Sequence, residues 1–181
     1  RLPTDFEAAR RLLVDAGYPA GRGLPTFELL LTNSENQHLI AEAVQEMWRR
    51  ELGVQVRLVN QEFKAVLAER RAGHYQILFS DWVGDYLDPT TFLDVWRSDS
   101  GNNHTGWSSA AYDSLLRSAS LTTDAAARNA FFQKAEALLL EAAPIVPLYY
   151  NTHIFLLQPS VRGWHPTLLD HHPYKDVWLE E

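Results

Sequence analysis

The sequence contains no cysteine among its 181 residues. Disulfide scaffolds, thiolate zinc sites and catalytic thiols are therefore excluded. No apolar run approaches the length of a membrane-spanning helix. Sixteen Lys and Arg against 23 Asp and Glu leave a formal net charge of −7, so the chain has no basic surplus to neutralise phosphates or anionic lipid. We expect neither nucleic acid nor a membrane surface as a partner.

The composition that is present is that of a folded globular protein. Hydrophobic residues make up 46% and charged residues 22% of the chain, and its length suits one ordinary domain. The chain begins with Arg1 rather than Met, and no charged-then-apolar signal pattern follows. We therefore expect it to be a fragment of a longer polypeptide, whose location the opening residues do not reveal.

The first half of the chain alternates short apolar strands with longer helical patterns. A capping pattern from Thr4 to Glu7 predicts a first helix, and Ser34 and Gly53 bound a second. Strands are predicted at 27–31, 54–59 and 75–79, with a further helix at 61–72. Helices between short strands suit parallel crossover connections, so the predicted fold class is α/β, with a mostly parallel sheet flanked by helices.

The second half of the chain changes character. Residues 98–109 are polar and predict a loop, and apolar positions over 112–119 and 131–142 predict two helices that pack together. Two strands are predicted at 144–150 and 153–157, and an irregular tail follows from Pro159.

The densest group of polar and aromatic side chains follows the third predicted strand, from Ser80 to Pro89. Ligands of α/β proteins gather outside the carboxyl ends of strands. A carboxylate beside Trp and Tyr suits a cationic amine, because the aromatic faces add about 0.5–2 kcal/mol of cation–π attraction. Asp85 is the favoured candidate and Asp81 a weaker one, whereas Asp88 before Pro89 is typical of a helix N-cap.

The same carboxylates do not form a pattern typical of a metal or catalytic site. No two histidines stand four residues apart on a predicted helix, and the Asp spacing does not match a calcium loop. The pair His171 and His172 is predicted to lie in a solvated tail. No nucleophile elbow or phosphate-binding glycine loop is present. We expect no catalytic residue, no metal ion, no cofactor and no enzyme activity, and retain an acid–base hydrolase using Asp81 and Asp85 as the alternative.

Phe63, Leu67 and Arg70 share one face of the third predicted helix. An Arg in the last turn interacts favourably with the helix dipole, which is a sufficient structural explanation. The functional alternative is that Phe63 and Arg70 face a cleft, where the guanidinium pairs with a carboxylate through two hydrogen bonds.

Seven segments in order carry a family resemblance: 53–63, 68–73, 82–93, 100–103, 112–116, 144–150 and 169–170. Together they resemble the oligopeptide-binding proteins of family 5, the extracytoplasmic solute-binding components of peptide ABC transporters. The resemblance implies the C-terminal lobe of a two-lobe protein with a type II periplasmic-binding-protein-like fold. Residues 1–158 would form that lobe, and residues 159–181 a tail that returns to the first lobe.

The resemblance also implies binding residues. In the oligopeptide-binding branch the Asp of a Trp-x-x-Asp-Tyr motif receives the peptide α-amino group, and the motif matches Trp82, Val83, Gly84, Asp85 and Tyr86. The aromatic that lines the cleft matches Phe63, and Arg70 stands where that branch commonly has an Arg.

Two positions depart from the family pattern. Phe79 stands where some members place an Arg for the peptide carboxylate, and Gln37 stands where a His serves the same end. These changes leave recognition of the amino end intact and disfavour short free peptides, so a longer, capped or non-standard ligand is expected.

The implied function is binding without catalysis. Two lobes would close on a peptide or a related amine-bearing solute and deliver it to a membrane permease. The protein would be a monomer in the periplasm, or lipid-anchored outside a Gram-positive cell. A free-standing interaction module is the third reading, and it would bind its ligand tightly with these residues alone.

Overall fold

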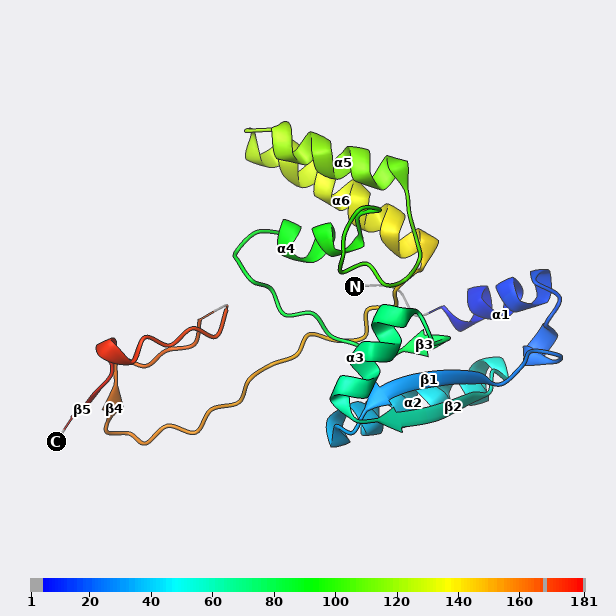
Figure 1. The fold of residues 1–181 in the computed structure, drawn as a ribbon, viewed down its shortest axis with the longest axis horizontal. Helices are drawn as coiled ribbons and strands as arrows, with labels where there is room; N and C mark the ends of the chain where they lie inside the picture. The colour runs from blue at the N-terminus through cyan, green and yellow to red at the C-terminus, as the bar shows by residue number, and fades with distance from the viewer. Residues whose placement is uncertain (1–4, 168, 181) are drawn as a thin grey trace. The chain divides into compact units, whose positions relative to one another are not determined.

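The structure is a computed structural model that describes residues 5–167 and 169–180. The chain divides after Asp81 into two compact units. We call the described part of the first the sheet unit and that of the second the helical unit, and each is described by itself (Figure 1).

The sheet unit alternates strands and helices as predicted. Its elements are α1 (Phe6–Asp15), the 3-10 turn η1 (Pro19–Gly21), β1 (Phe27–Thr32), α2 (Glu35–Leu52), β2 (Val56–Gln61), α3 (Phe63–Ala72) and β3 (Ile77–Leu78). The strands are parallel in the order β2-β1-β3. The α/β fold class with a parallel sheet is therefore confirmed. Because the two crossovers move in opposite directions along the sheet, right-handed connections place α2 and α3 on opposite faces, as Figure 1 shows.

The core of the sheet unit lies along its central strand. Leu29, Leu30 and Leu31 of β1 are all buried, and Ala41 of α2 and Val56 of β2 are buried with them. A central strand covered by helices on both faces reads as a continuous apolar run rather than an alternating one.

Both ends of α2 agree with the sequence prediction. The Ser34 hydroxyl accepts a hydrogen bond from the backbone N–H of Gln37 at 3.5 Å, and Gly53 ends the helix with φ at +70°. A Cβ at Gly53 would lie 2.1 Å from the carbonyl oxygen of Ala20. Glycine is thus required there both by conformation and by close packing.

Two predicted boundaries shift. Thr4, expected to cap the first helix, lies outside the described residues, and the Asp5 carboxylate accepts from the backbone N–H of Ala8 at 2.8 Å instead. Gln61 was expected to open a helix but is the last residue of β2, because the ladder with β1 continues to it. Glu62 then caps α3.

The helical unit contains the predicted helix pair. Its elements are α4 (Thr90–Leu93), η2 (Asp94–Trp96), α5 (Ala110–Leu121), α6 (Ala125–Ala142), β4 (Val161–Arg162), η3 (Tyr174–Asp176) and β5 (Trp178–Leu179). Helices α5 and α6 pack against each other. Their shared core consists of Tyr112, Leu116, Ala119, Phe132, Ala135 and Leu139.

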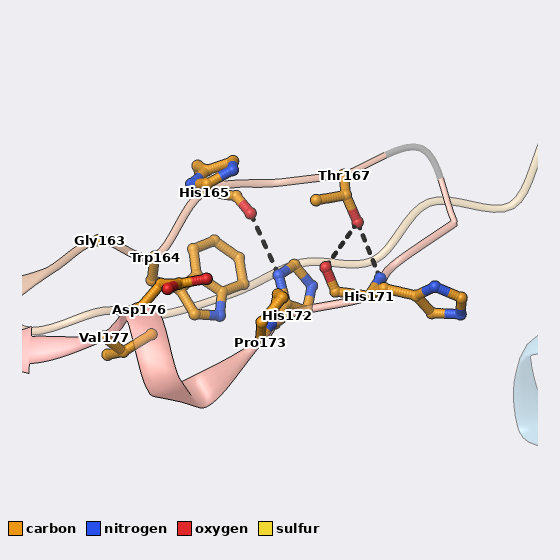
Figure 2. Close-up of a pocket in the computed structure, with 9 residues that line it drawn as sticks. All are labelled: Gly163, Trp164, His165, Thr167, His171, His172, Pro173, Asp176 and Val177. Atoms are coloured by element: carbon orange, nitrogen blue, oxygen red, sulfur yellow. Dashed lines mark hydrogen bonds between the residues drawn. The ribbon is translucent and has the colours of Figure 1, made fainter.

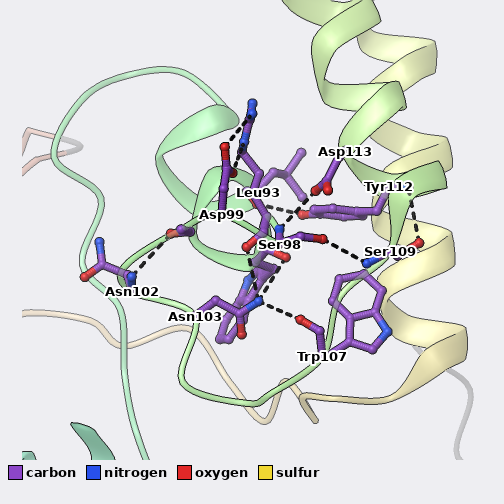
Figure 3. A network of polar contacts seen from close by, with 12 residues as sticks. Leu93, Ser98, Asp99, Asn102, Asn103, Trp107, Ser109, Tyr112 and Asp113 are labelled. Carbon is purple, nitrogen blue, oxygen red and sulfur yellow. Dashed lines mark hydrogen bonds and ion pairs between the residues drawn. The ribbon is translucent and has the colours of Figure 1, made fainter.

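Asn103 organises the loop before α5 (Figure 3). Its amide nitrogen lies 3.3, 3.2 and 2.9 Å from the carbonyl oxygens of Trp96, Arg97 and Trp107. Its amide oxygen accepts from the backbone N–H and the hydroxyl of Thr105. The Asn103 side chain therefore forms hydrogen bonds with backbone groups of the loop that have no partner in a helix or strand. Asn103 belongs to one of the segments that carry the family resemblance, and its role here is structural.

Tyr112 joins this loop to the helix pair. The residue is 0% exposed, its hydroxyl donates to the carbonyl oxygen of Leu93 at 2.7 Å, and its ring meets Trp107 edge to face at 5.1 Å. Burial raises the pKa of Tyr112 well above its ordinary value, so the hydroxyl keeps its donor hydrogen at neutral pH.

The two strands predicted at 144–150 and 153–157 are wrong for this structure, in which these residues form neither helix nor strand. Tyr150, Ile154 and Leu156 are almost fully exposed. A strand forms only when a neighbour accepts its backbone hydrogen bonds, and the described residues supply none to this segment.

The tail predicted to be irregular contains a short antiparallel pair. Val161 lies opposite Leu179 and Arg162 opposite Trp178, and the Arg162 guanidinium contacts the Glu180 carboxylate. The boundary predicted between residues 158 and 159 concerns the arrangement of a longer protein and stays a prediction.

Candidate functional site

The residues after Asp81 fold back onto Thr91 of α4, and we call residues 82–89 the Asp85 loop. The indole N–H of Trp82 donates to the carbonyl oxygen of Thr91 at 2.7 Å, and the backbone N–H of Asp85 donates to the Thr91 hydroxyl at 2.8 Å. A Cβ at Gly84 would lie 3.1 Å from both the Thr91 methyl group and the Phe92 ring. The loop is therefore held at both ends and packed closely in its middle.

The Asp85 side chain is exposed at the turn of this loop. Among the described residues, no hydrogen bond or ion pair to its carboxylate is found. Val83 and Tyr86, on either side, expose much of their apolar surface. A fixed backbone thus presents an unpaired negative charge beside aromatic and aliphatic groups, a combination that suits an alkylammonium ligand.

Asp88 was predicted to be the N-cap of this helix, but in the structure Pro89 holds that position and Asp88 precedes it. Helix α4 begins at Thr90 with Pro89 at the N-cap position, and the Asp88 carboxylate accepts from the Thr90 hydroxyl at 2.7 Å and its backbone N–H at 3.1 Å. The same carboxylate accepts two hydrogen bonds from the Arg128 guanidinium, at 2.7 and 2.9 Å. Arg128 lies on α6, and no local pattern in the sequence signals this partnership.

The Asp88 pair predicts a pH-dependent contribution to stability. The Arg128 guanidinium, with help from Thr90, holds the pKa of the Asp88 carboxyl well below its ordinary value. Because the folded pKa is lowered, the contribution is complete above about pH 4 and is lost as the pH falls through the folded pKa. Asp88→Asn should lower the free energy of unfolding by about 1–2 kcal/mol at neutral pH, allowing for partial exposure of the pair.

Denaturant titrations at several pH values test this expectation. The difference between Asp88→Asn and the parent protein should narrow below about pH 4. Asp99, an exposed carboxylate paired with Arg97, supplies the matched control, and Asp99→Asn should produce no measurable change. A difference for Asp88→Asn that stays constant with pH would rule out the charged pair.

Phe63 and Arg70 lie on α3 in the sheet unit. Phe63 is 58% exposed at the first helical position, and Arg70 stands in the last turn. Seven residues of helix separate them by about 10 Å along the axis. The Arg70 Nε atom is buried, and no hydrogen-bond partner is found for it among the described residues. Because these two residues and the Asp85 loop belong to different units, their common role stays a prediction.

The two departures from the family pattern have structural explanations. Phe79 is buried in the core of the sheet unit. The side-chain oxygen of Gln37 accepts from the Thr32 hydroxyl at 2.7 Å and from the Thr32 backbone N–H at 3.3 Å, so it secures the end of β1. Neither position supplies a positive charge for a ligand carboxylate.

The prediction that His172 is solvated is wrong. Its side chain is 12% exposed and stacks on Trp164, with ring centroids 4.4 Å apart. Its Nε2 lies 2.5 Å from the Asp170 carboxylate and its Nδ1 lies 3.1 Å from the His165 carbonyl oxygen. Packing of the tail around this ring covers most of it, whereas His171 is exposed. Both histidines line the small pocket drawn in Figure 2.

The Asp170 carboxylate also contacts His153. The pKa of Asp170 is lowered, and the hydrogen bond from His172 is the main cause. Within residues 5–167 and 169–180, no group of three or more His, Asp or Glu side chains is arranged to hold a metal ion. No helix in the same residues is long and apolar enough to cross a membrane. The contacts among Asp170, His153, His172 and Trp164 therefore hold the tail together.

Comparison with known proteins gives the family. The family model described as bacterial extracellular solute-binding proteins, family 5 middle, matches residues 1–104. The chain belongs to this family. It is 40% identical over 156 residues to the periplasmic murein peptide-binding protein MppA of Escherichia coli, covering 86% of this chain and 29% of MppA.

Two further similarities bear on the family-5 chain. It is 39% identical over 173 residues to the probable deoxycholate-binding periplasmic protein YgiS of E. coli, covering 96% of the chain and 31% of YgiS. A crystal structure of a periplasmic oligopeptide-binding protein from Borrelia burgdorferi matches with a TM-score of 0.88 and 32% identity, over 99% of the chain and 37% of that protein.

The family-5 chain thus spans about 30% of the length of the curated relatives described above. All three of these relatives are named as binding proteins, which favours the binding interpretation over the hydrolase alternative. The resemblance inferred from the sequence is confirmed at the level of the family.

Proposed function

We propose that the protein containing this chain is the extracytoplasmic binding component of a peptide ABC transporter. It holds a peptide or a related amine-bearing solute between two lobes and presents it to a membrane permease. It acts as a monomer, without cofactor or catalysis, in the periplasm or anchored outside a Gram-positive cell. The observation that carries the proposal is the unpaired Asp85 carboxylate on a loop whose backbone is fixed.

Asp85 distinguishes between the ligand classes named for the relatives. An ammonium group gains a charge-assisted hydrogen bond from an exposed carboxylate, and Trp82 and Tyr86 of the same motif add aromatic surface. An anion such as deoxycholate would be repelled by the same carboxylate. The charge on this loop therefore favours a peptide amino end over an anionic ligand.

Phe63 and Arg70 complete the proposed set of binding residues. The exposed Phe63 ring offers apolar surface to a ligand side chain. The Arg70 guanidinium, whose Nε lacks a partner among the described residues, offers a donor for a ligand carbonyl or carboxylate.

Native mass spectrometry of the full-length protein, purified without denaturation, tests the proposal. We expect co-purifying ligands that carry a free amino group and fragment as peptides. Recovery of anionic, amine-free ligands alone would contradict it.

Turnover of a peptide or glycoside that is lost on replacement of Asp81 or Asp85 would support the hydrolase instead. Tight binding by the isolated 181-residue chain would favour the free-standing interaction module.

A further inference from the structure

Thr91 contacts the Asp85 loop through three different groups. Its hydroxyl accepts a hydrogen bond from the backbone N–H of Asp85, and its carbonyl oxygen accepts one from the Trp82 indole. Its methyl group packs so closely against Gly84 that a Cβ there would lie 3.1 Å from it. Thr91 is only 5% exposed, although it lies in a short surface helix. The hydroxyl, the carbonyl oxygen and the backbone N–H of this buried threonine therefore all form hydrogen bonds with the Asp85 loop.

We infer that Thr91 is the positioning residue that fixes Asp85 for the ligand ammonium group, an inference that rests on the proposed function. A Thr side chain has few accessible rotamers, so a buried Thr91 holds its hydroxyl oxygen in one place. The hydrogen bond from Asp85 N–H to that oxygen restrains the backbone from which the carboxylate projects. Affinity rises when a binding group is held in its bound geometry before the ligand arrives.

Thr91 is itself held from the body of the helical unit. Its backbone N–H donates to the carbonyl oxygen of Asp88 at 3.1 Å, and the Asp88 carboxylate is gripped by Arg128 of α6. Arg128 in turn lies over the Phe132 ring, 4.6 Å from its centroid. A continuous set of contacts therefore runs from helix α6 through Asp88 and Thr91 to Asp85.

Three variants of the full-length protein separate positioning from general stability. Thr91→Val keeps the size and removes the hydroxyl, and Thr91→Ser keeps the hydroxyl. Thr122→Val is the matched control, because it makes the same change after α5, where the hydroxyl donates to the Ser118 carbonyl oxygen and contacts no residue of the Asp85 loop. In the ligand-free protein, amide exchange at Asp85 should rise about tenfold in Thr91→Val, the effect of losing one neutral hydrogen bond.

Exchange of the Trp82 indole N–H is the internal reference. Its acceptor is the main-chain carbonyl of Thr91, so Thr91→Val should leave it unchanged. Thr91→Ser should restore slow exchange at Asp85, and Thr122→Val should not affect it. Equal acceleration at Trp82 and Asp85, or an unchanged Asp85 amide, would overturn the inference.

Affinity supplies the functional measurement. The probes are alanine peptides of increasing length, each with a free and with an acetylated amino end, and the series extends to long peptides because the sequence disfavours short free ones. Thr91→Val should weaken binding of the free-amine form about tenfold, leave the acetylated form unchanged, and be rescued by Thr91→Ser.

The two failures can be told apart. A parent protein that binds none of the peptides, or binds both forms equally, would contradict the proposed function. A parent that prefers the free amine, loses the preference in Asp85→Asn and keeps it in Thr91→Val would contradict only the positioning role of Thr91.

Discussion

Replacing Asp85 by Ala in the full-length protein should weaken binding of a free-amine peptide by at least about a hundredfold, since leaving a buried ligand charge without its partner costs on the order of 3–5 kcal/mol. The expectation depends on a carboxylate that makes no hydrogen bond or ion pair of its own within the described residues and is therefore available to the ligand. Isothermal titration calorimetry with free and acetylated alanine peptides measures the effect directly.

Asp81 supplies the control for this substitution. It is an exposed Asp four residues earlier and lies outside the Asp85 loop, so Asp81→Ala should leave the dissociation constant unchanged. The acetylated peptide, which has no ammonium group, should bind Asp85→Ala and the parent protein equally. A dissociation constant for the free-amine peptide that Asp85→Ala leaves unaltered would remove Asp85 from the site.

Replacing Tyr112 by Ala should cause the largest loss of stability, lowering the free energy of opening of the α5–α6 pair by about 3–5 kcal/mol. The ring is completely buried, packs edge to face on Trp107 and donates its hydroxyl to the Leu93 carbonyl. Truncation would remove this packing and leave both a cavity and an unpaired carbonyl oxygen.

Tyr112→Phe is the graded companion, because it removes only the hydroxyl and should cost about 1 kcal/mol. Hydrogen exchange of the α5 and α6 amides in the full-length protein reports both losses locally. If Tyr112→Ala cost no more than Tyr112→Phe, the ring would not support the packing described for the helical unit.

The sheet unit was largely predictable because its signals are local. Ser34 marks the start of α2 through its side-chain hydrogen bond, Gly53 marks the end through its left-handed backbone conformation, and the apolar runs mark the buried strands. The Asp85 loop was chosen as the candidate site by its position after the last parallel strand, and its role in binding stays a prediction. The sequence did not predict how deeply each residue of this region is buried.

The remaining errors involve partners that are distant in the sequence. Arg128 lies forty residues from the Asp88 carboxylate that it binds, and no local pattern pairs the two. His172 was assigned to solvent because nothing near it in the sequence indicates that Trp164 and Phe155 enclose it. The strands predicted within residues 144–157 were wrong because these residues have no neighbouring strand to pair with in the described chain.

A crystal structure of the full-length protein with a bound free-amine peptide would test the central claim most directly. The proposal predicts the peptide α-amino nitrogen at about 2.7–2.9 Å from an Asp85 carboxylate oxygen, with the Asp85 N–H still bonded to Thr91. A ligand whose amino end is bound by other groups, while the Asp85 carboxylate faces solvent, would contradict it.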